Sequence, residues 1–204
     1  MTGPVRAVLF DLDGVLIDSY EAWFVVVNAA AAFLGRPEVS RDRFGSVWGQ
    51  GISADLVNLY PGCTREEVES TYVRAMTQQA STIRVNPEAH TCLADLARRG
   101  IRRALVTNTQ LGLARAILGA TGLAAHFDDI EGARPGVREK PEPDLLLAAL
   151  DALGVPAADA LMIGDSRYDE EAAAAARVRF LHYDLKSGAS LLAAIDAALA
   201  SRTS

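Results

Sequence analysis

The segment VLFDLDGVLIDS, residues 8–19, constrains the fold more than any other part of the chain. Residues 5–10 are apolar with one exception, and a continuous hydrophobic run is typical of a strand buried on both faces of a parallel sheet. The run ends at Asp11, Asp13 follows two residues later, and Gly14 allows the chain to turn away. The sequence therefore predicts two carboxylates at the carboxyl end of a buried strand, where open α/β sheets bind ligands.

Two ionised carboxylates beside a hydrophobic strand repel each other and lose hydration, so a hard cation or a shared proton is expected there. We interpret Asp11 and Asp13 as a candidate metal and catalytic site. A plain turn is the alternative, because Asp and Gly are common turn residues. An EF-hand loop fits less well, because Gly14 falls at its fourth position instead of its sixth and Ala22 stands in place of the final Glu.

Composition limits the classes of partner. The 204 residues are 50% hydrophobic and 23% charged, with a net charge of −6 and no basic stripe interleaved with aromatic residues, so no nucleic-acid partner is expected. Neither an N-terminal signal segment nor a membrane-spanning window is recognisable, which predicts a cytoplasmic protein without a membrane partner. Cys63 and Cys92 are too few for a zinc framework, although a disulfide between them stays possible. Monomer and homodimer are both open.

Residues 19–83 hold no strand-like run and offer helix starts instead. Asp18 or Ser19 is expected to cap the first helix, and Thr64 has Glu67 in capping-box spacing ahead of another. This stretch therefore predicts an all-helical block inserted directly after the acidic motif.

From residue 86 onward, helical and strand-like patterns alternate, which is typical of βαβ units around a parallel sheet. The expected fold class is therefore α/β. The strands expected in this part are residues 104–107, 127–130, 160–163 and 179–183, and the helices are residues 86–100, 111–118, 143–153, 172–176 and a last one from about 187.

Polar residues also follow two of the later strands. Thr107 and Asn108 come at the end of one, and Asp165 follows another, with Asp169 four residues further on at a helix start. Lys140 precedes a proline at the entrance to a helix. Each residue alone has an ordinary structural explanation, such as a helix cap or a solvated cation. Together they place at one sheet edge the hydroxyl, amide, cation and carboxylates that phosphoryl transfer uses.

Four segments resemble the motifs of the haloacid dehalogenase (HAD) superfamily, in its phosphoglycolate phosphatase and β-phosphoglucomutase-like branch with a helical cap. The resemblance covers nearly the whole chain in order and spacing. It implies a Rossmann-like core domain of residues 1–18 and 84–204, whose first strand is central, and a cap domain of residues 19–83 that closes over the site. The four segments are DLDGVLIDS, VTNT, EKPEPD and GDSRYD.

The resemblance also implies roles for the acidic residues. Asp11 would be the nucleophile that forms an aspartyl-phosphate, and Asp13 would be the general acid and would later activate water. Mg²⁺ would lie between Asp11, the backbone carbonyl of Asp13, and Asp165, with Asp169 in support. Physical chemistry agrees, since a carboxylate nucleophile divides one difficult hydrolysis into two steps. Asp13 needs a raised pKa to act as an acid at neutral pH.

The resemblance makes Thr107, Asn108 and Lys140 the groups that bind the transferring phosphoryl group, with Lys140 also neutralising Asp11. The implied function is a Mg²⁺-dependent phosphatase for a small phosphorylated metabolite. Thr109 follows Asn108 where phosphoglycolate phosphatases often have a lysine, so the substrate stays open.

Two other functions remain as alternatives. The β-phosphoglucomutases carry a His in the first cap helix and an Arg in the loop between cap helices, where this chain has Trp23 and Ala54, so a phosphatase is favoured over a mutase. A non-catalytic module that keeps the fold and binds a phosphorylated ligand or a partner protein is disfavoured, because all the motif residues are intact. The candidates for reading the substrate are Gly49, Gln50, Gly51 and Ser53, with Trp48 beside them as either a substrate contact or a packed core residue.

Overall fold

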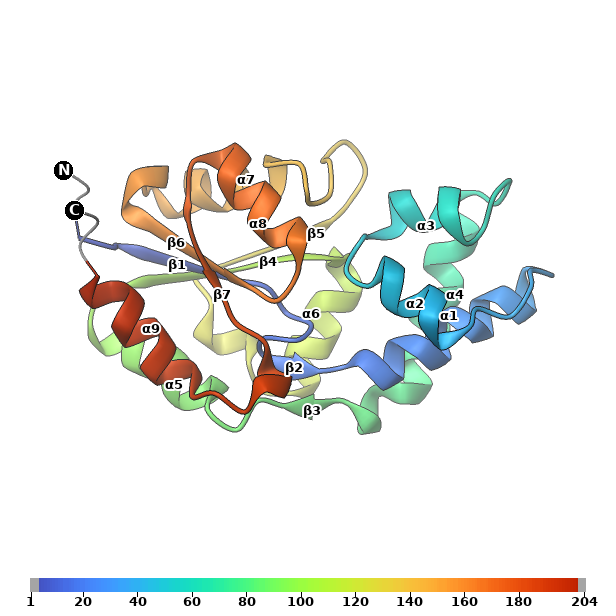
Figure 1. Ribbon diagram of the computed structural model, residues 1–204, viewed down its shortest axis with the longest axis horizontal. Helices are drawn as coiled ribbons and strands as arrows, with labels where there is room; N and C mark the ends of the chain where they lie inside the picture. Colours follow the sequence, from blue (N-terminus) through green and yellow to red (C-terminus); the bar gives the residue numbers. More distant parts are fainter. Residues whose placement is uncertain (1–3, 202–204) are drawn as a thin grey trace.

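A parallel five-stranded sheet forms the centre of the computed structural model, which describes residues 4–201 (Figure 1). Its strand order is β5-β4-β1-β6-β7, and β1 pairs in parallel with both β4 and β6. This arrangement confirms the expected α/β class and the central place of the first strand. The strands are β1 (Ala7–Phe10), β4 (Arg102–Gln110), β5 (Asp129–Ala133), β6 (Ala160–Gly164) and β7 (Arg179–His182).

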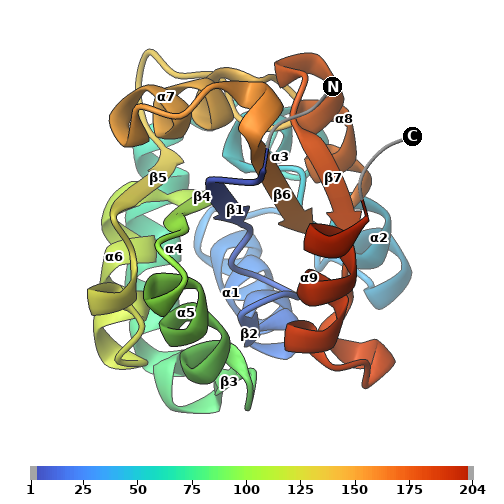
Figure 2. The same ribbon diagram turned by 90° about the vertical axis from the view of Figure 1, so that its left-hand side faces the viewer.

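Helices cover both faces of the sheet (Figure 2). On one face lie α7 (Asp144–Leu153) and α8 (Arg167–Ala176), and on the other lie α5 (Ala89–Arg98), α6 (Leu111–Ala120) and α9 (Leu191–Ala200). The short 3₁₀ turns are η1 (Ala80–Thr82), η2 (Ala124–His126), η3 (Ala157–Asp159) and η4 (Leu185–Ser187).

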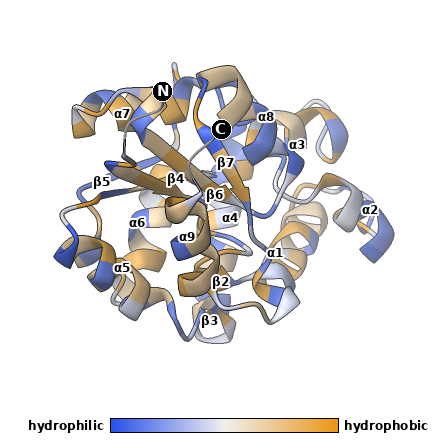
Figure 3. Ribbon diagram, turned by 60° about the vertical axis from the view of Figure 1, so that its left-hand side comes forward, coloured by the Kyte–Doolittle hydropathy of each residue, from blue (hydrophilic) through white to orange (hydrophobic). Residues whose placement is uncertain are grey.

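The alternation of side chains along β1 divides the core into two layers. Val8 and Phe10 belong to the hydrophobic cluster on the α5 and α9 side, whereas Ala7 and Leu9 belong to the cluster on the α7 and α8 side. All four are fully buried, as expected for a strand with a helix layer on each face. The residues of β1 and β6 are all buried and almost all hydrophobic, whereas β5 also carries polar residues (Figure 3).

Four helices gather at one end of the sheet, beside the carboxyl ends of its strands (Figure 1). They are α1 (Tyr20–Phe33), α2 (Arg41–Val47), α3 (Ile52–Asn58) and α4 (Arg65–Gln79). The chain enters this group through β2 (Ile17–Asp18) and leaves it through β3 (Arg84–Val85), and these two strands pair antiparallel. Reading residues 19–83 as a cap domain stays a prediction.

Two expectations about helix starts have different outcomes. The Thr64–Glu67 capping box is present, with both reciprocal hydrogen bonds. Ser19 is the N-cap residue of α1, as expected, but its side chain makes no capping hydrogen bond, and Asp18 lies in β2. The Ser19 hydroxyl donates to Asp13 instead, so a local capping pattern has given way to a contact with the acidic motif.

Other boundaries shift by a few residues. The strand expected at residues 104–107 continues to Gln110, and its register with β5 is irregular between Thr107 and Gln110. The helix expected from residue 86 begins at Ala89, after a turn in which Asn86 Oδ1 accepts from the Glu88 N–H (3.0 Å), and the Asn86 amide also donates to the carbonyl of Val15 (2.9 Å). The two cysteines are free.

The buried core predicts a difference between two identical substitutions. Leu105→Ala removes a fully buried side chain from β4 and should lower the free energy of unfolding by about 2–5 kcal/mol. Leu147→Ala, in the half-exposed part of α7, should lower it by less than about 1 kcal/mol. Urea denaturation followed by circular dichroism measures both, and equal losses would contradict the assigned core.

Candidate active site

Lys140 joins three segments at the carboxyl ends of the strands. Its ammonium donates to Asp11 Oδ1 (2.7 Å), to Asp169 Oδ1 (2.5 Å) and to the carbonyl of Val106 (2.9 Å). These contacts use the three N–H donors of a lysine, and the side chain is almost completely buried. The structure therefore brings Asp11, Lys140 and Asp169 together, although 129 residues separate the first two in sequence.

Charge and burial oppose each other in this cluster. Burial raises the pKa of Asp11 well above its ordinary value, although the Lys140 ammonium partly offsets this by stabilising the carboxylate. Burial lowers the pKa of Lys140, but Asp11 and Asp169 together raise it more, so that it lies above its ordinary value. Lys140 is therefore a permanent cation at neutral pH, and it favours the ionised form of Asp11.

The carboxylates of Asp11, Asp165 and Asp169 each offer an oxygen atom within 4.8 Å of the others. Oxygen ligands at such spacing fit a hard divalent cation such as Mg²⁺. Burial and the nearby Asp169 raise the pKa of Asp165 to about 7. The protein therefore does not supply enough positive charge to neutralise these three carboxylates. The donor set therefore fits a magnesium ion.

Two glycines beside these acids have no room for a side chain. Gly14 has a φ of +82°, and a Cβ atom on it would overlap the Asp165 carboxylate. A Cβ atom on Gly164 would overlap Asp169 in the same way. Asp169 also accepts from the Ser166 backbone N–H (3.1 Å) and from its hydroxyl, in the capping box that begins α8. Both Asp169 oxygens thus have protein donors.

Asp13 is held by three side chains. The Ser19 hydroxyl and the Trp23 indole N–H (3.0 Å) donate to Oδ1, and the Thr109 hydroxyl donates to Oδ2 (2.9 Å). Burial raises the pKa of Asp13, although these hydrogen bonds oppose the shift. A carboxyl group that is oriented in this way and has a raised pKa can exchange protons closer to neutral pH than an exposed Asp.

Thr107 and Asn108 occupy different environments at the end of β4. Thr107 is buried, lines the cavity, and accepts a hydrogen bond from the backbone of Thr109 (3.1 Å). The Asn108 amide donates to the carbonyls of Gly49 and Lys140 (both 2.9 Å) and accepts from the Lys140 N–H (2.7 Å). Asn108 therefore connects the loop at Gly49 with the segment that carries Lys140.

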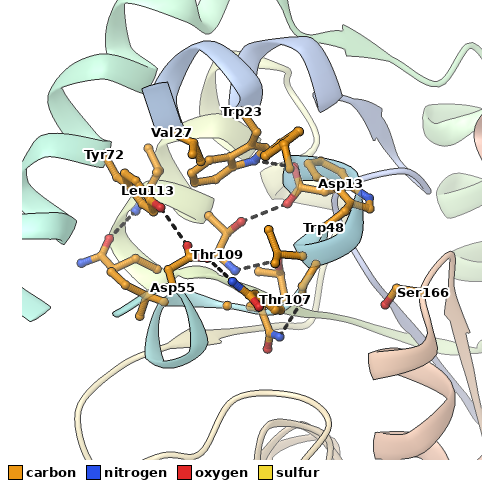
Figure 4. Close-up of a pocket in the computed structure, with 18 of the residues that line it drawn as sticks. Asp13, Trp23, Val27, Trp48, Asp55, Tyr72, Thr107, Thr109, Leu113 and Ser166 are labelled. Atoms are coloured by element: carbon orange, nitrogen blue, oxygen red, sulfur yellow. Dashed lines mark hydrogen bonds between the residues drawn. The ribbon is translucent and has the colours of Figure 1, made fainter. Parts of the chain in front are cut away.

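A cavity lies between these residues and the helices α1–α4 (Figure 4). Gly49, Gln50 and Gly51 line it, as does Trp48. The structure does not bring Ser53 to the cavity wall: its N–H donates to Glu139 (2.9 Å) and its hydroxyl accepts from Arg65.

Trp48 packs among aromatic residues and also lies beside the acidic site, while its role as a substrate contact stays a prediction. Its ring packs against Tyr20 and Phe44, with ring centroids 4.9 and 5.5 Å away, as a core residue would. Its indole N–H also donates to Asp165 Oδ2 (3.3 Å).

Several residues that line the cavity were not identified from the sequence. Thr109 belongs to the VTNT segment and Trp23 lies one turn into α1, so their closeness to the motifs was a usable signal. Asp55 and Tyr72 had no such signal, because only the packing of α3 and α4 brings them to the cavity.

Comparison with known proteins agrees with this geometry. The family model for haloacid dehalogenase-like hydrolases matches residues 5–177. Phosphoglycolate phosphatases of Pseudomonas savastanoi pv. phaseolicola and Rhodospirillum rubrum are each 33% identical over 85% of this chain, which spans 67% and 77% of their lengths. The crystal structure of CbbY from Rhodobacter sphaeroides in complex with phosphate has a TM-score of 0.77 at 25% identity, covering 88% of this chain and 86% of CbbY.

The fold and the acidic site thus define a phosphatase of the α/β class. The chain belongs to the haloacid dehalogenase-like hydrolase family, and the expected enzyme class, a phosphoric monoester hydrolase, is confirmed. Within residues 4–201, no helix has the length and apolar character needed to cross a membrane.

The buried cation predicts a large stability effect. Lys140→Met leaves Asp11 and Asp169 without their shared partner, and should lower the free energy of unfolding by roughly 3–5 kcal/mol. Lys186→Met, at the only other lysine of the chain, changes an exposed side chain and should leave stability nearly unchanged. Chemical denaturation at neutral pH measures both variants. Similar stability of the two would show that Lys140 does not neutralise this cluster.

Proposed function

We propose that the protein is a Mg²⁺-dependent phosphatase that hydrolyses a small phosphorylated metabolite through an aspartyl-phosphate on Asp11. The observation that carries the proposal is the Asp11 carboxylate, held by Lys140 at 2.7 Å, in the wall of a cavity that Asp13 also lines. The family membership and the phosphatase relatives support it.

The first step transfers the phosphoryl group to the protein. The Asp11 carboxylate attacks phosphorus, the bond from phosphorus to the ester oxygen breaks, and Asp13 donates a proton to the departing oxygen. Thr107 donates its hydroxyl to a phosphoryl oxygen, whereas Lys140, whose three donors bind Asp11, Asp169 and the Val106 carbonyl, supplies positive charge beside the site and favours the ionised form of Asp11. Positioning and charge neutralisation supply most of the catalysis in such reactions.

The second step regenerates the enzyme. Asp13, now a carboxylate, takes a proton from a water molecule, whose oxygen attacks the phosphorus of the aspartyl-phosphate. The acyl phosphate bond breaks, so that inorganic phosphate leaves and Asp11 is again a free carboxylate. The hydrogen bonds from Ser19, Trp23 and Thr109 orient Asp13 for both proton transfers.

Asp11, Asp165 and the backbone carbonyl of Asp13 are the groups that would hold Mg²⁺, which when bound supplies positive charge against the phosphoryl oxygens. Asp169 acts mainly by fixing Lys140 and the start of α8, because both of its oxygens already accept hydrogen bonds from protein donors.

Residues 1–18 and 84–204 form the catalytic core in this proposal, and residues 19–83 form a cap that covers the leaving group. Gly49, Gln50 and Gly51 belong to the cap loop nearest the site. Ser53 contributes indirectly, since it contacts Glu139 and Arg65. Asn108 holds the Gly49 loop in place.

A phosphatase is preferred to a phosphomutase because of Trp23. Its indole, at the position where the mutases carry a His, donates a hydrogen bond to Asp13 and has no proton to exchange at neutral pH.

The names of the relatives point to phosphoglycolate, and CbbY has also been solved with xylulose-(1,5)-bisphosphate bound. Phosphoglycolate is therefore the first ester to test.

The nucleophile can be tested directly. Asp11→Asn should lower phosphate release from a panel of small esters by at least about a thousandfold, because an amide cannot form the acyl phosphate. The circular dichroism spectrum should stay that of the wild type. Rapid acid quenching with ³²P-labelled ester should detect labelled protein in the wild type only. Turnover retained by Asp11→Asn would remove Asp11 as the nucleophile.

The metal site has a separate test. Asp165→Asn should weaken Mg²⁺ binding, measured by calorimetric titration, by roughly tenfold or more, and should shift the activating Mg²⁺ concentration upward by a similar factor. Asp151→Asn makes the same change at an exposed position in α7 and should alter neither value. The ligand role of Asp165 would be lost if the two variants bound Mg²⁺ equally.

A further inference from the structure

The charged side chains that line the cavity are all acidic. Besides the carboxylates of the phosphoryl site, they include Asp55 from α3 and Glu69 from α4. Among residues 4–201, no Lys, Arg or His side chain lines this cavity. The complete acidic set is Asp11, Asp13, Asp55, Glu69 and Asp165.

The cations nearest in the structure have other partners. Lys140 is bonded to Asp11 and Asp169 at the phosphoryl site. Arg65 forms ion pairs with Glu139 (2.6 Å) and Glu69 (2.9 Å).

The second lysine and the VTNT segment supply no cation to this cavity either. Lys186 lies over the Tyr20 ring and lines a neighbouring cavity. Thr109, where the related phosphatases often have a lysine, donates its hydroxyl to Asp13. A second anionic group on the substrate would therefore meet no free cation in the cavity.

Asp55 is the polar centre of the cavity wall that α1–α4 supply. Its oxygens accept from Gln50 Nε2 (2.6 Å) and from the Tyr72 hydroxyl (2.8 Å). Burial raises the pKa of Asp55 to about 6, and the hydrogen bonds from Gln50 and Tyr72 favour its ionised form. Figure 4 shows Asp55 and Tyr72 on one side of the cavity and Asp13 on the other. A buried carboxylate that has only neutral donors favours a ligand with a hydroxyl or ammonium group.

Apart from Asp55, Gln50, Glu69 and Tyr72, most side chains of this wall are apolar. A carboxylate seated there would lose its hydration without an ionic partner and would face the unpaired carboxylate of Asp55, and both effects are unfavourable. Glu69 contributes less, because it is paired with Arg65. An apolar wall is compatible with the carbon skeleton of a small alcohol. The apolar residues are Trp23, Val27, Phe44, Val47, Ile52, Leu59 and Val73.

We propose that the enzyme selects phosphate monoesters whose leaving group carries no negative charge and presents a hydroxyl or ammonium group to Asp55. Esters with a carboxylate or a second phosphate on the leaving group, such as phosphoglycolate, are poor substrates. This inference rests on the proposed phosphatase function and names the substrate class of the same site.

The test compares kcat/KM for four esters in the presence of Mg²⁺: 2-phosphoglycolate, glycerol 3-phosphate, O-phosphoethanolamine and p-nitrophenyl phosphate. Glycerol 3-phosphate and O-phosphoethanolamine should each exceed 2-phosphoglycolate by about tenfold or more. A higher kcat/KM for 2-phosphoglycolate than for both would overturn the inference. Hydrolysis of p-nitrophenyl phosphate reports the proposed function separately, because its activated leaving group needs little recognition. Release from none of the four esters would contradict the phosphatase proposal itself.

A variant tests the role of Asp55. Asp55→Asn removes the negative charge, while the Tyr72 hydroxyl can accept from the new amide and donate to Tyr60, whose hydroxyl is 3.2 Å away. The preference for the two esters over 2-phosphoglycolate should fall at least about threefold. Hydrolysis of p-nitrophenyl phosphate should change much less. An unchanged preference in a folded Asp55→Asn protein would overturn the role of Asp55.

Two further variants serve as controls for the Asp55→Asn result. Asp42→Asn makes the same change at an exposed position in α2 and should preserve the wild-type ranking of esters. Val73→Lys adds a cation at a half-exposed position of the cavity wall and should raise kcat/KM for 2-phosphoglycolate relative to glycerol 3-phosphate. A fall in that ratio would contradict the electrostatic explanation. Thermal unfolding of each variant confirms that it is folded before its ranking is compared.

Discussion

The buried contact between Lys140 and two carboxylates is the interaction on which the site depends. Asp11 follows the central strand, Asp169 lies in the first turn of α8, and Lys140 comes from the segment before α7, so one ammonium fixes three segments at the same sheet edge. Removing these ions from water is costly, and their short hydrogen bonds offset that cost only while all partners are present. The strands must therefore be correctly placed for these charges to balance, and the charges must balance for Asp11 to act as a nucleophile.

The same segment also connects the sheet to the helices that cover the site. Glu139, directly before Lys140, accepts from the Ser53 N–H and from Arg65, and Asn108 bonds to both Lys140 and Gly49. A Cβ atom on Gly51 would lie 2.6 Å from Glu139 Oε2, so the two parts are closely packed there. The residues that neutralise Asp11 and those that hold the covering loop are thus neighbours in sequence, and a displacement of one would be felt by the other.

The sequence predicted what depends on short-range pattern. The hydrophobic run before Asp11, the Thr64–Glu67 capping box and the glycine after α7 are local features, and the structure has all three. Ser19 shows where local reasoning fails: a cap and a hydrogen bond to Asp13 compete for one hydroxyl, and only tertiary packing decides between them. The Asp55–Tyr72 contact joins two helices, and the spacing of these two residues along the sequence follows no pattern that could have predicted it.

The two halves of the cavity have different chemical roles. The half built from the sheet edge needs a carboxylate nucleophile, an acid and compensating positive charge, whatever the rest of the ester contains, so motifs shared across a family define it. In the proposed function the half built from α1–α4 surrounds the leaving group, although its Trp23 also orients Asp13. Differences of charge near Asp55 therefore change the ranking of substrates more than they change the phosphoryl chemistry. Similarity to phosphoglycolate phosphatases in the first half is therefore compatible with a different leaving group in the second. At this position the acid Asp55, and not the family motifs, carries the information about the substrate.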